Sequence, residues 1–176
     1  MTEVEYGTAT TVASIPRERN VLVLDLSKSM LAPLPDPSGS EKQKIEVART
    51  AVYRILENAE TTSSEFGLVT FTETVRVAVP LGVIHKENLP YVESLISMLT
   101  PSGRSAIWDG LAVGADMLRR GAAGVHGTLV LVTDGWDNAS TRFEVRDPST
   151  PGVAGGRIDL IPYLLPEGSA LTLRVI

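Results

Sequence analysis

Hydrophobic residues along this chain fall into short unbroken runs that alternate with helical stripes. The β-prone runs Val21–Leu24 and Thr128–Val132 have no polar alternation, which predicts two strands buried on both faces. The runs Phe66–Phe71 and Val75–Val79 flank a short polar turn and predict a hairpin. A last run, Leu171–Ile176, predicts one more strand at the end of the sequence.

Three segments have the apolar spacing of an amphipathic helix. Over 41–59 apolar residues recur every three or four positions, so this segment predicts a helix with one buried face. A second stripe, Val92–Leu99, has Pro90 in its expected first turn. Ser105 is well placed to cap a third helix, which we expect Gly121 to end.

This order of elements predicts an α/β fold with a doubly wound, mostly parallel sheet. The hairpin adds one antiparallel edge strand, and helices cover both faces. We expect one domain over residues 19–176, preceded by an N-terminal segment, residues 1–18, that is either an added strand or a tail. The proline-rich segment 33–37 predicts a loop that is not helical.

Composition narrows the classes of function. A chain of 176 residues with a net charge of −5 is one domain by length, and its acidity argues against nucleic-acid binding, which usually needs a basic face. The absence of cysteine excludes disulfides and thiolate metal sites. The first residues lack an apolar signal core, and no apolar run reaches the ~20 residues that a membrane span needs. We therefore expect no membrane span and a cytoplasmic location.

Oxygen-bearing side chains follow the predicted strands. Asp25, Ser27 and Ser29 come directly after the first buried run, Asp134 follows the second, and Ser105 precedes the third helix. In doubly wound sheets ligands collect beyond the carboxyl ends of the strands, where both aspartates are expected. Hard oxygen donors suit Mg²⁺, and Mn²⁺ would fit the same donors. The five residues together predict a divalent-cation site.

These motifs resemble the metal-ion-dependent adhesion site of von Willebrand factor type A (vWA) domains. That family carries an Asp-x-Ser-x-Ser loop, a distant Thr in a Gly-rich loop, and an Asp followed by Gly. Residues 20–176 fit this order, with Ser105 where the family usually has Thr. The resemblance implies that the three serine hydroxyls coordinate the ion, while Asp25 and Asp134 act directly or through water. It also implies that the strands preceding the two aspartates are central neighbours.

The resemblance implies a binding module rather than an enzyme. In adhesion-type members, the open coordination position of the ion takes a carboxylate from a protein partner, so we expect a partner that presents an acidic residue. An alternative within the family is an intracellular subunit that acts with an AAA+ ATPase in complex assembly or cofactor insertion. A metal-dependent phosphatase or hydrolase is a further alternative. However, no general base is identifiable, no His follows Asp134, and no phosphate-binding glycine loop is present.

Four more residues lie near the predicted site in sequence. Asp109 is either an outer-shell hydrogen-bond acceptor or an exposed residue in a first helical turn. Asp137 lies in the loop after the second buried strand, where a structural role is expected. Lys28 and Arg104 either select an acidic partner or are solvated loop residues.

Two further features concern the surface. Trp108 and Trp136 flank the predicted metal loops and either pack inside or form an exposed contact surface. The family normally continues beyond the last predicted strand with a helix and another strand, so this chain is either a fragment of a longer protein or has a sheet one strand short. We expect the apolar edge formed by Leu171–Ile176 to be covered by residues 8–14, by a second copy of the chain, or by a separate subunit.

Overall fold

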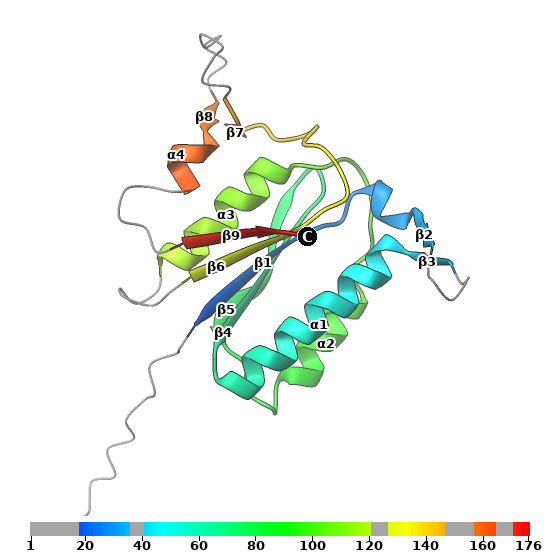
Figure 1. The fold of residues 1–176 in the computed structure, drawn as a ribbon, viewed down its shortest axis with the longest axis vertical. Coiled ribbons are helices and arrows are strands. Elements are labelled where there is room, and N and C mark those ends of the chain that lie inside the picture. Colours follow the sequence, from blue (N-terminus) through cyan, green and yellow to red (C-terminus); the bar gives the residue numbers. More distant parts are fainter. Residues whose placement is uncertain (1–17, 36–40, 121–126, 147–156, 165–170) are drawn as a thin grey trace, which may run out of the picture.

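In a computed structural model that describes residues 18–35, 41–120, 127–146, 157–164 and 171–176, the chain forms one central sheet between two layers of helices. The sheet has five strands in the order β5-β4-β1-β6-β9 (Figure 1). Their bounds are β1 Arg19–Asp25, β4 Glu65–Phe71, β5 Val75–Val83, β6 Gly127–Val132 and β9 Leu171–Val175. Only β5 runs antiparallel to its neighbour. The predicted α/β fold with one antiparallel edge is confirmed.

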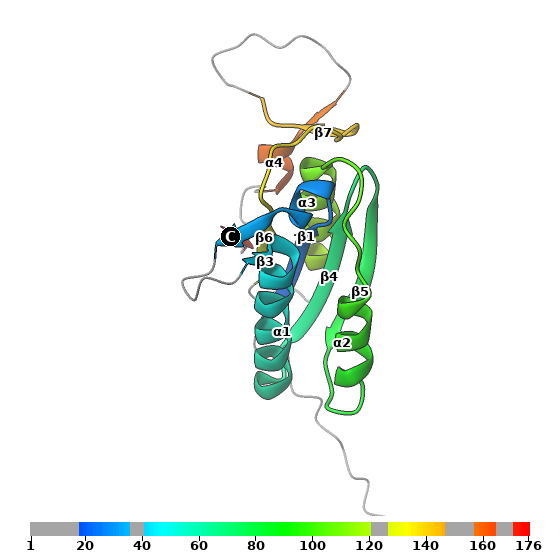
Figure 2. The same ribbon diagram turned by 90° about the vertical axis from the view of Figure 1, so that its right-hand side faces the viewer.

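Helices cover both faces of this sheet (Figure 2). On one face lie α1 (Lys44–Thr62) and α2 (Leu89–Ser97), which share an apolar core with Leu22, Leu24, Val130 and Val132. On the other face lie α3 (Ile107–Arg119) and the short α4 (Leu160–Leu164), packed on Val21, Val23, Leu129 and Leu131. Alternate residues of the same strands therefore serve two separate cores. Within the described ranges, no helix has both the length and the apolar character needed to cross a membrane.

The central position of β1 explains its unbroken hydrophobic pattern. It pairs in parallel with β4 on one side and β6 on the other, and residues 21–25 are all fully buried. A strand buried on both faces has no position that favours a polar side chain. The prediction that the strands preceding Asp25 and Asp134 are central neighbours is confirmed by this pairing.

Several local predictions need correction. The first helix begins at Lys44 rather than at Glu41, because residues 41–43 form β3 (Glu41–Gln43), which pairs antiparallel with β2 (Pro33–Pro35). The Gln43 and Glu46 side chains cap the start of this helix reciprocally. Ser105 does not cap α3, which begins after Ala106 without a side-chain cap. The prediction that Gly121 ends this helix, and that of a strand over residues 8–14, lie outside the described residues.

The remaining small elements were not predicted. They are the 3-10 helix η1 (Lys28–Leu31), the short helix α4 and the two-residue strands β7 (Phe143–Glu144) and β8 (Ile158–Asp159). The two strands pair with each other. The last predicted strand is confirmed as β9 at one edge of the sheet, where Leu173, Val175 and Ile176 are exposed. Its outer edge has no partner strand among the described residues.

Two glycines let α3 approach the sheet closely. A Cβ atom added at Gly114 would lie 2.7 Å from Leu129 Cδ1 and 2.8 Å from Val23 Cγ2. One added at Gly110 would lie 2.9 Å from Phe71 Cδ1. Real Cβ atoms do not come this close to other heavy atoms, so the packing of α3 on β1 depends on the missing side chains.

We expect Gly114→Ala to destabilise the domain. Overpacking a core with one methyl group destabilises a protein by about 1–3 kcal/mol. The higher helix propensity of alanine offsets up to about 1 kcal/mol of this loss. The free energy of unfolding, measured by urea denaturation, should fall by the difference. Gly82→Ala in β5 is the matched control, since its added Cβ would have no neighbour within 4 Å. Equal stability of the two variants would contradict the close-packing argument.

Candidate functional site

Three loops meet at the carboxyl ends of the central strands (Figure 1). The loop after β1 is joined to the loop between α2 and α3 by backbone hydrogen bonds from Ser102 N to Leu26 O at 2.7 Å and from Lys28 N to Gly103 O at 3.1 Å. Gly103 has a φ of +67°, in the left-handed region that glycine adopts without strain. The loop after β6 joins them through Asn138 N, which donates to Ser105 O at 2.9 Å.

The carboxylate of Asp25 lies at the centre of this junction and is completely buried. Its Oδ1 accepts a hydrogen bond from Ser27 N at 2.7 Å. Its Oδ2 accepts from Ser105 Oγ at 3.0 Å and from Thr133 Oγ1 at 2.6 Å. One carboxylate therefore contacts all three loops. Among the described residues, no cationic side chain forms an ion pair with it.

A second chain of contacts runs along the rim. Ser27 Oγ lies 2.9 Å from Ser29 Oγ, which donates to Asp134 Oδ1 at 2.8 Å. The other carboxylate oxygen of Asp134 forms a salt bridge of 2.5 Å with Lys44 Nζ, at the first residue of α1. The structure thus brings the five predicted site residues into two hydrogen-bonded groups, which are joined through the backbone N–H of Ser27.

Two residues of this network were missed by the sequence analysis. Thr133 donates to Asp25, and its hydroxyl also accepts from Gly135 N at 3.3 Å. Its place directly between the second buried run and Asp134 was a usable signal. Lys44 gave no such signal, because 90 residues separate it from Asp134.

Asp109 contacts a loop rather than the site hydroxyls. Its carboxylate accepts backbone hydrogen bonds from Thr141 N at 2.9 Å, Arg142 N at 3.1 Å and Phe143 N at 3.0 Å. In return Asp109 N donates to Ser140 Oγ at 3.1 Å. The side chain therefore anchors the segment after β6 to the first turn of α3.

The other three rim residues occupy different positions. Asp137 Oδ1 accepts from Trp108 N at 3.3 Å and also from the Ser140 hydroxyl, so it too joins this loop to α3. Lys28 is exposed at the start of η1. Arg104 is exposed as well and forms a surface salt bridge of 3.1 Å with Glu73.

The two tryptophans differ in exposure. Trp108 is partly buried against the core beneath α3. Trp136 is 90% exposed and stands two positions after Asp134 in the sequence. Most of the surface of a large aromatic side chain is therefore in contact with water beside the candidate site.

The donors at this site are mainly hydroxyl groups. The described part of the chain contains no group of three or more His, Cys, Asp or Glu side chains that could hold a metal ion. Any cation bound here would have two carboxylates and several hydroxyls as ligands, a set of hard oxygens that suits Mg²⁺ or Mn²⁺ and excludes soft-metal chemistry.

Sequence comparison identifies the family. Residues 20–136 match the model of the von Willebrand factor type A domain. This match covers more than half of the chain, and the fold agrees with it, so the chain belongs to the von Willebrand factor type A domain family. No curated protein shows a significant match to the chain.

Solved structures share this fold. A von Willebrand factor type A protein from Catenulispora acidiphila has a TM-score of 0.58 at 24% identity, over 72% of this chain and 28% of that one. The pilus adhesin SpaC from Lactobacillus rhamnosus GG has a TM-score of 0.56 at 23% identity, over 71% of this chain and 16% of that one. The vWF domain of the type V pili tip protein Mfa5 from Porphyromonas gingivalis has a TM-score of 0.53 at 18% identity, over 71% of this chain and 40% of that one. These identities are low, so the likeness establishes the fold alone, and the chain spans less than half of each relative.

We expect Asp109→Ala to destabilise the domain without changing the affinity of the site for cations. Three backbone N–H groups would lose a charged acceptor, and leaving that of the buried Phe143 unsatisfied costs about 1–3 kcal/mol, whereas water can replace the acceptor of the other two. Urea denaturation measures the loss, and hydrogen exchange at residues 141–143 should become faster. Glu73→Ala, which removes an exposed carboxylate from a surface salt bridge, is the control. A weaker cation affinity with unchanged stability would instead assign Asp109 an outer-shell role.

Proposed function

We propose that this vWA domain is a divalent-cation-dependent protein-binding module. Ser27, Ser29 and Ser105, with Asp25 and Asp134, would hold Mg²⁺ or Mn²⁺ as a metal-ion-dependent adhesion site. The bound ion would supply an electrophilic position that takes an acidic group from a protein partner.

The buried carboxylate of Asp25 is the observation that carries this proposal. Moving a carboxylate out of water is costly unless it is paired or fully hydrogen-bonded. Asp25 receives three hydrogen bonds, but two of them come from the hydroxyls of Ser105 and Thr133, which can reorient toward a cation. A divalent cation at this position would supply the charge compensation that no side chain of the described residues provides.

The spacing of the oxygen atoms fits a small octahedral ion. Neighbouring ligands of an octahedron with metal–oxygen distances of about 2.1 Å lie about 3.0 Å apart. The contacts Ser27–Ser29, Ser29–Asp134 and Ser105–Asp25 measure 2.9, 2.8 and 3.0 Å between their oxygen atoms. The oxygen atoms of each contact therefore lie at the spacing that neighbouring ligands of such an ion require.

The charge balance at the rim favours an acidic partner. Asp25 and Asp134 contribute two negative charges, and Lys44 contributes one positive charge. A divalent cation would change this local sum from −1 to +1, which an incoming carboxylate could neutralise. Trp136, exposed in the same loop, offers the kind of aromatic surface that often dominates the binding energy of protein interfaces.

No observation among the described residues favours either alternative function, the subunit that acts with an AAA+ ATPase or the metal-dependent hydrolase. An AAA+ ATPase as the partner therefore stays a prediction. A hydrolase would need a general base near the site, and the carboxylates closest to it in the chain, Asp109 and Asp137, are bound to backbone N–H groups.

The metal assignment predicts a stability change on adding Mg²⁺. Metal at about 100 times its Kd should stabilise the folded chain by about 2.7 kcal/mol, measured as a thermal shift and checked by calorimetric titration. Both signals should vanish in Asp25→Ala and Asp134→Ala, and weaken in Ser105→Ala. Asp116→Ala, which alters a carboxylate on α3 that contacts Tyr163 and Arg119, should bind metal like the parent chain. Unchanged binding in both site variants would refute the assignment.

The partner assignment predicts metal-dependent and tryptophan-dependent binding. Proteins captured from an extract of the source organism in Mg²⁺ should be released when the metal is removed, and Asp25→Ala should not capture them. With the purified partner, Trp136→Ala should lower the affinity about tenfold or more, as expected for an interface hot spot, while Mg²⁺ affinity stays constant. Trp108→Phe, at the partly buried tryptophan, is the control. A partner that binds equally well without metal would contradict the proposal.

A further inference from the structure

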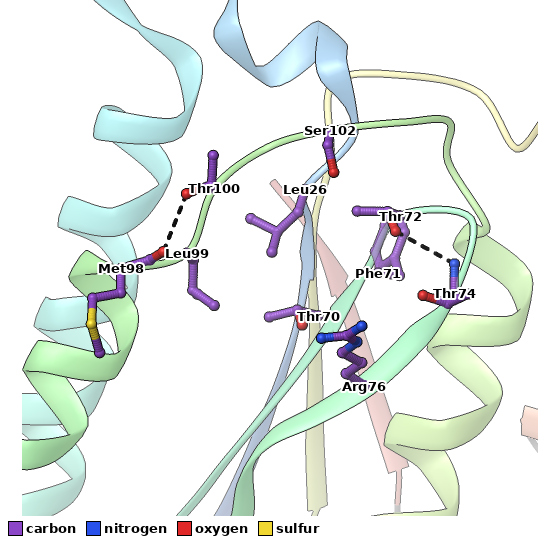
Figure 3. Close-up of a pocket in the computed structure, with 10 residues that line it drawn as sticks. All are labelled: Leu26, Thr70, Phe71, Thr72, Thr74, Arg76, Met98, Leu99, Thr100 and Ser102. Carbon is purple, nitrogen blue, oxygen red and sulfur yellow. Dashed lines mark hydrogen bonds between the residues drawn. The ribbon is translucent and has the colours of Figure 1, made fainter.

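A separate cleft lies behind the candidate metal loops, between the β4–β5 hairpin and the segment after α2 (Figure 3). Its volume is about 330 Å³. Leu26 and Phe71, both buried, and the partly buried Leu99 contribute apolar wall. Leu26 lies between two predicted metal ligands, Asp25 and Ser27, so the cleft and the candidate metal site share one loop.

The polar side chains of this cleft are hydroxyls and one guanidinium group. All ten residues that line it belong to the described part of the chain, and Arg76 alone among them is charged. The hydroxyls come from Thr70, Thr72, Thr74, Thr100 and Ser102. The set thus offers several hydrogen-bond donors and one positive charge, with no carboxylate facing them from the lining.

Arg76 and Thr70 lie side by side in the cleft. They are paired across β4 and β5, and Figure 3 shows their polar atoms next to each other in the cleft. Within the described residues, neither side chain has a hydrogen bond or ion pair. Thr70 is only 5% exposed as a residue, and its side chain lines the cleft. Its hydroxyl can therefore donate to a molecule bound in the cleft.

Among the described residues, no acidic side chain forms an ion pair with Arg76. Glu73, in the turn between β4 and β5, is bound to Arg104 at 3.1 Å instead. The carboxyl end of α2 would repel an anion through its dipole. However, the Leu99 carbonyl just after this end accepts a hydrogen bond from Nη2 of Arg49. A second guanidinium group therefore lies behind the apolar wall and offsets the dipole.

We propose that this cleft binds a carboxylate attached to a small organic body. The guanidinium group of Arg76 would bind the carboxylate in its two-pronged geometry, and the Thr70 hydroxyl would donate a further hydrogen bond. Leu26, Phe71 and Leu99 would pack against the carbon atoms of the ligand. A single lining cation matches a monovalent carboxylate better than a phosphate dianion, which usually gathers several cations or a row of backbone N–H groups.

Two sources can supply this carboxylate, namely a free organic acid or an acidic side chain of a bound protein. The inference does not depend on the metal site, because the cleft residues are not the predicted metal ligands. The experiment is therefore done in buffer freed of divalent ions over a chelating resin. A negative result for carboxylate binding would not contradict the metal assignment, and a negative result for metal binding would not contradict carboxylate binding in the cleft.

The test is a titration followed by NMR with labelled protein. Butyrate, the capped peptide acetyl-Gly-Glu-Gly-amide, and inorganic phosphate are added separately. We expect saturable shifts of the Arg76 Nε–H signal and of the backbone amides of Leu26, Thr70 and Leu99 with at least one of the two carboxylate probes. Preference for butyrate would assign a free acid as the source, and equal or tighter binding of the peptide would assign an acidic side chain.

Variants decide whether the named residues carry the binding. Arg76→Gln should lower the affinity about tenfold or more, because a charge-assisted, bidentate contact is lost. Thr70→Val, which keeps the shape of the side chain and removes the hydroxyl, should weaken binding by a smaller factor. Arg54→Gln, an exposed arginine on α1, should have no effect. Binding of phosphate alone, absence of saturable shifts with every probe, or equal affinity in Arg76→Gln would overturn the proposal.

Discussion

The buried carboxylate of Asp25 organises the functional end of this molecule. It accepts hydrogen bonds from its own loop, from Ser105 in the loop before α3, and from Thr133 in the loop after β6. Few other loop arrangements are stable around a buried carboxylate, because each hydrogen bond that it loses raises the free-energy cost of burying it. The three loops are therefore held in one relative position by a single acceptor, although 80 and 108 residues separate it from its two hydroxyl donors.

This arrangement depends on the position of β1 in the sheet. Because β1 lies between β4 and β6, its end is where loops from both helical layers can converge. The layers themselves are fixed by packing that allows little adjustment, since α3 contacts β1 through two glycines on one face and α1 covers the other. The hydrophobic core thus places the backbone, and Asp25 fixes the loops that extend from it.

The sequence pattern predicts those parts of the structure that depend on local burial. The buried faces of the three main helices are confirmed, because their apolar spacing fits only a helix. The strand Val21–Leu24 is confirmed as well, because its run of β-prone residues is too short for a helix. The short pair β2 and β3 escaped prediction, since residues 41–43 are exposed and show no apolar alternation. The two-residue strands β7 and β8 are too short to show any period.

The candidate site was also predicted only in part from the sequence. Its five predicted oxygen ligands could be named because each follows a strand or precedes a helix, and the fold brings them together. Ser105 was wrongly expected to cap α3, because a serine before an apolar stripe has the same appearance whether its hydroxyl turns to the helix or to a distant carboxylate. The contact of Lys44 depends on three-dimensional proximity, which no local pattern reports, whereas the position of Thr133 directly before Asp134 was a local signal.

The salt bridge between Lys44 and Asp134 links the rim of the candidate site to the start of α1. Lys44 is the first residue of α1, and its backbone N–H is also bound to Ala32 O at 3.1 Å, in the segment after η1. Any ligand that takes Asp134 from the ammonium group releases one tether of the start of this helix. The ammonium group of Lys44 is thus the counter-ion of Asp134 and belongs to a helix 19 residues long. By linkage, a ligand that weakened this salt bridge would bind more tightly if the start of α1 were already displaced, by the same free energy.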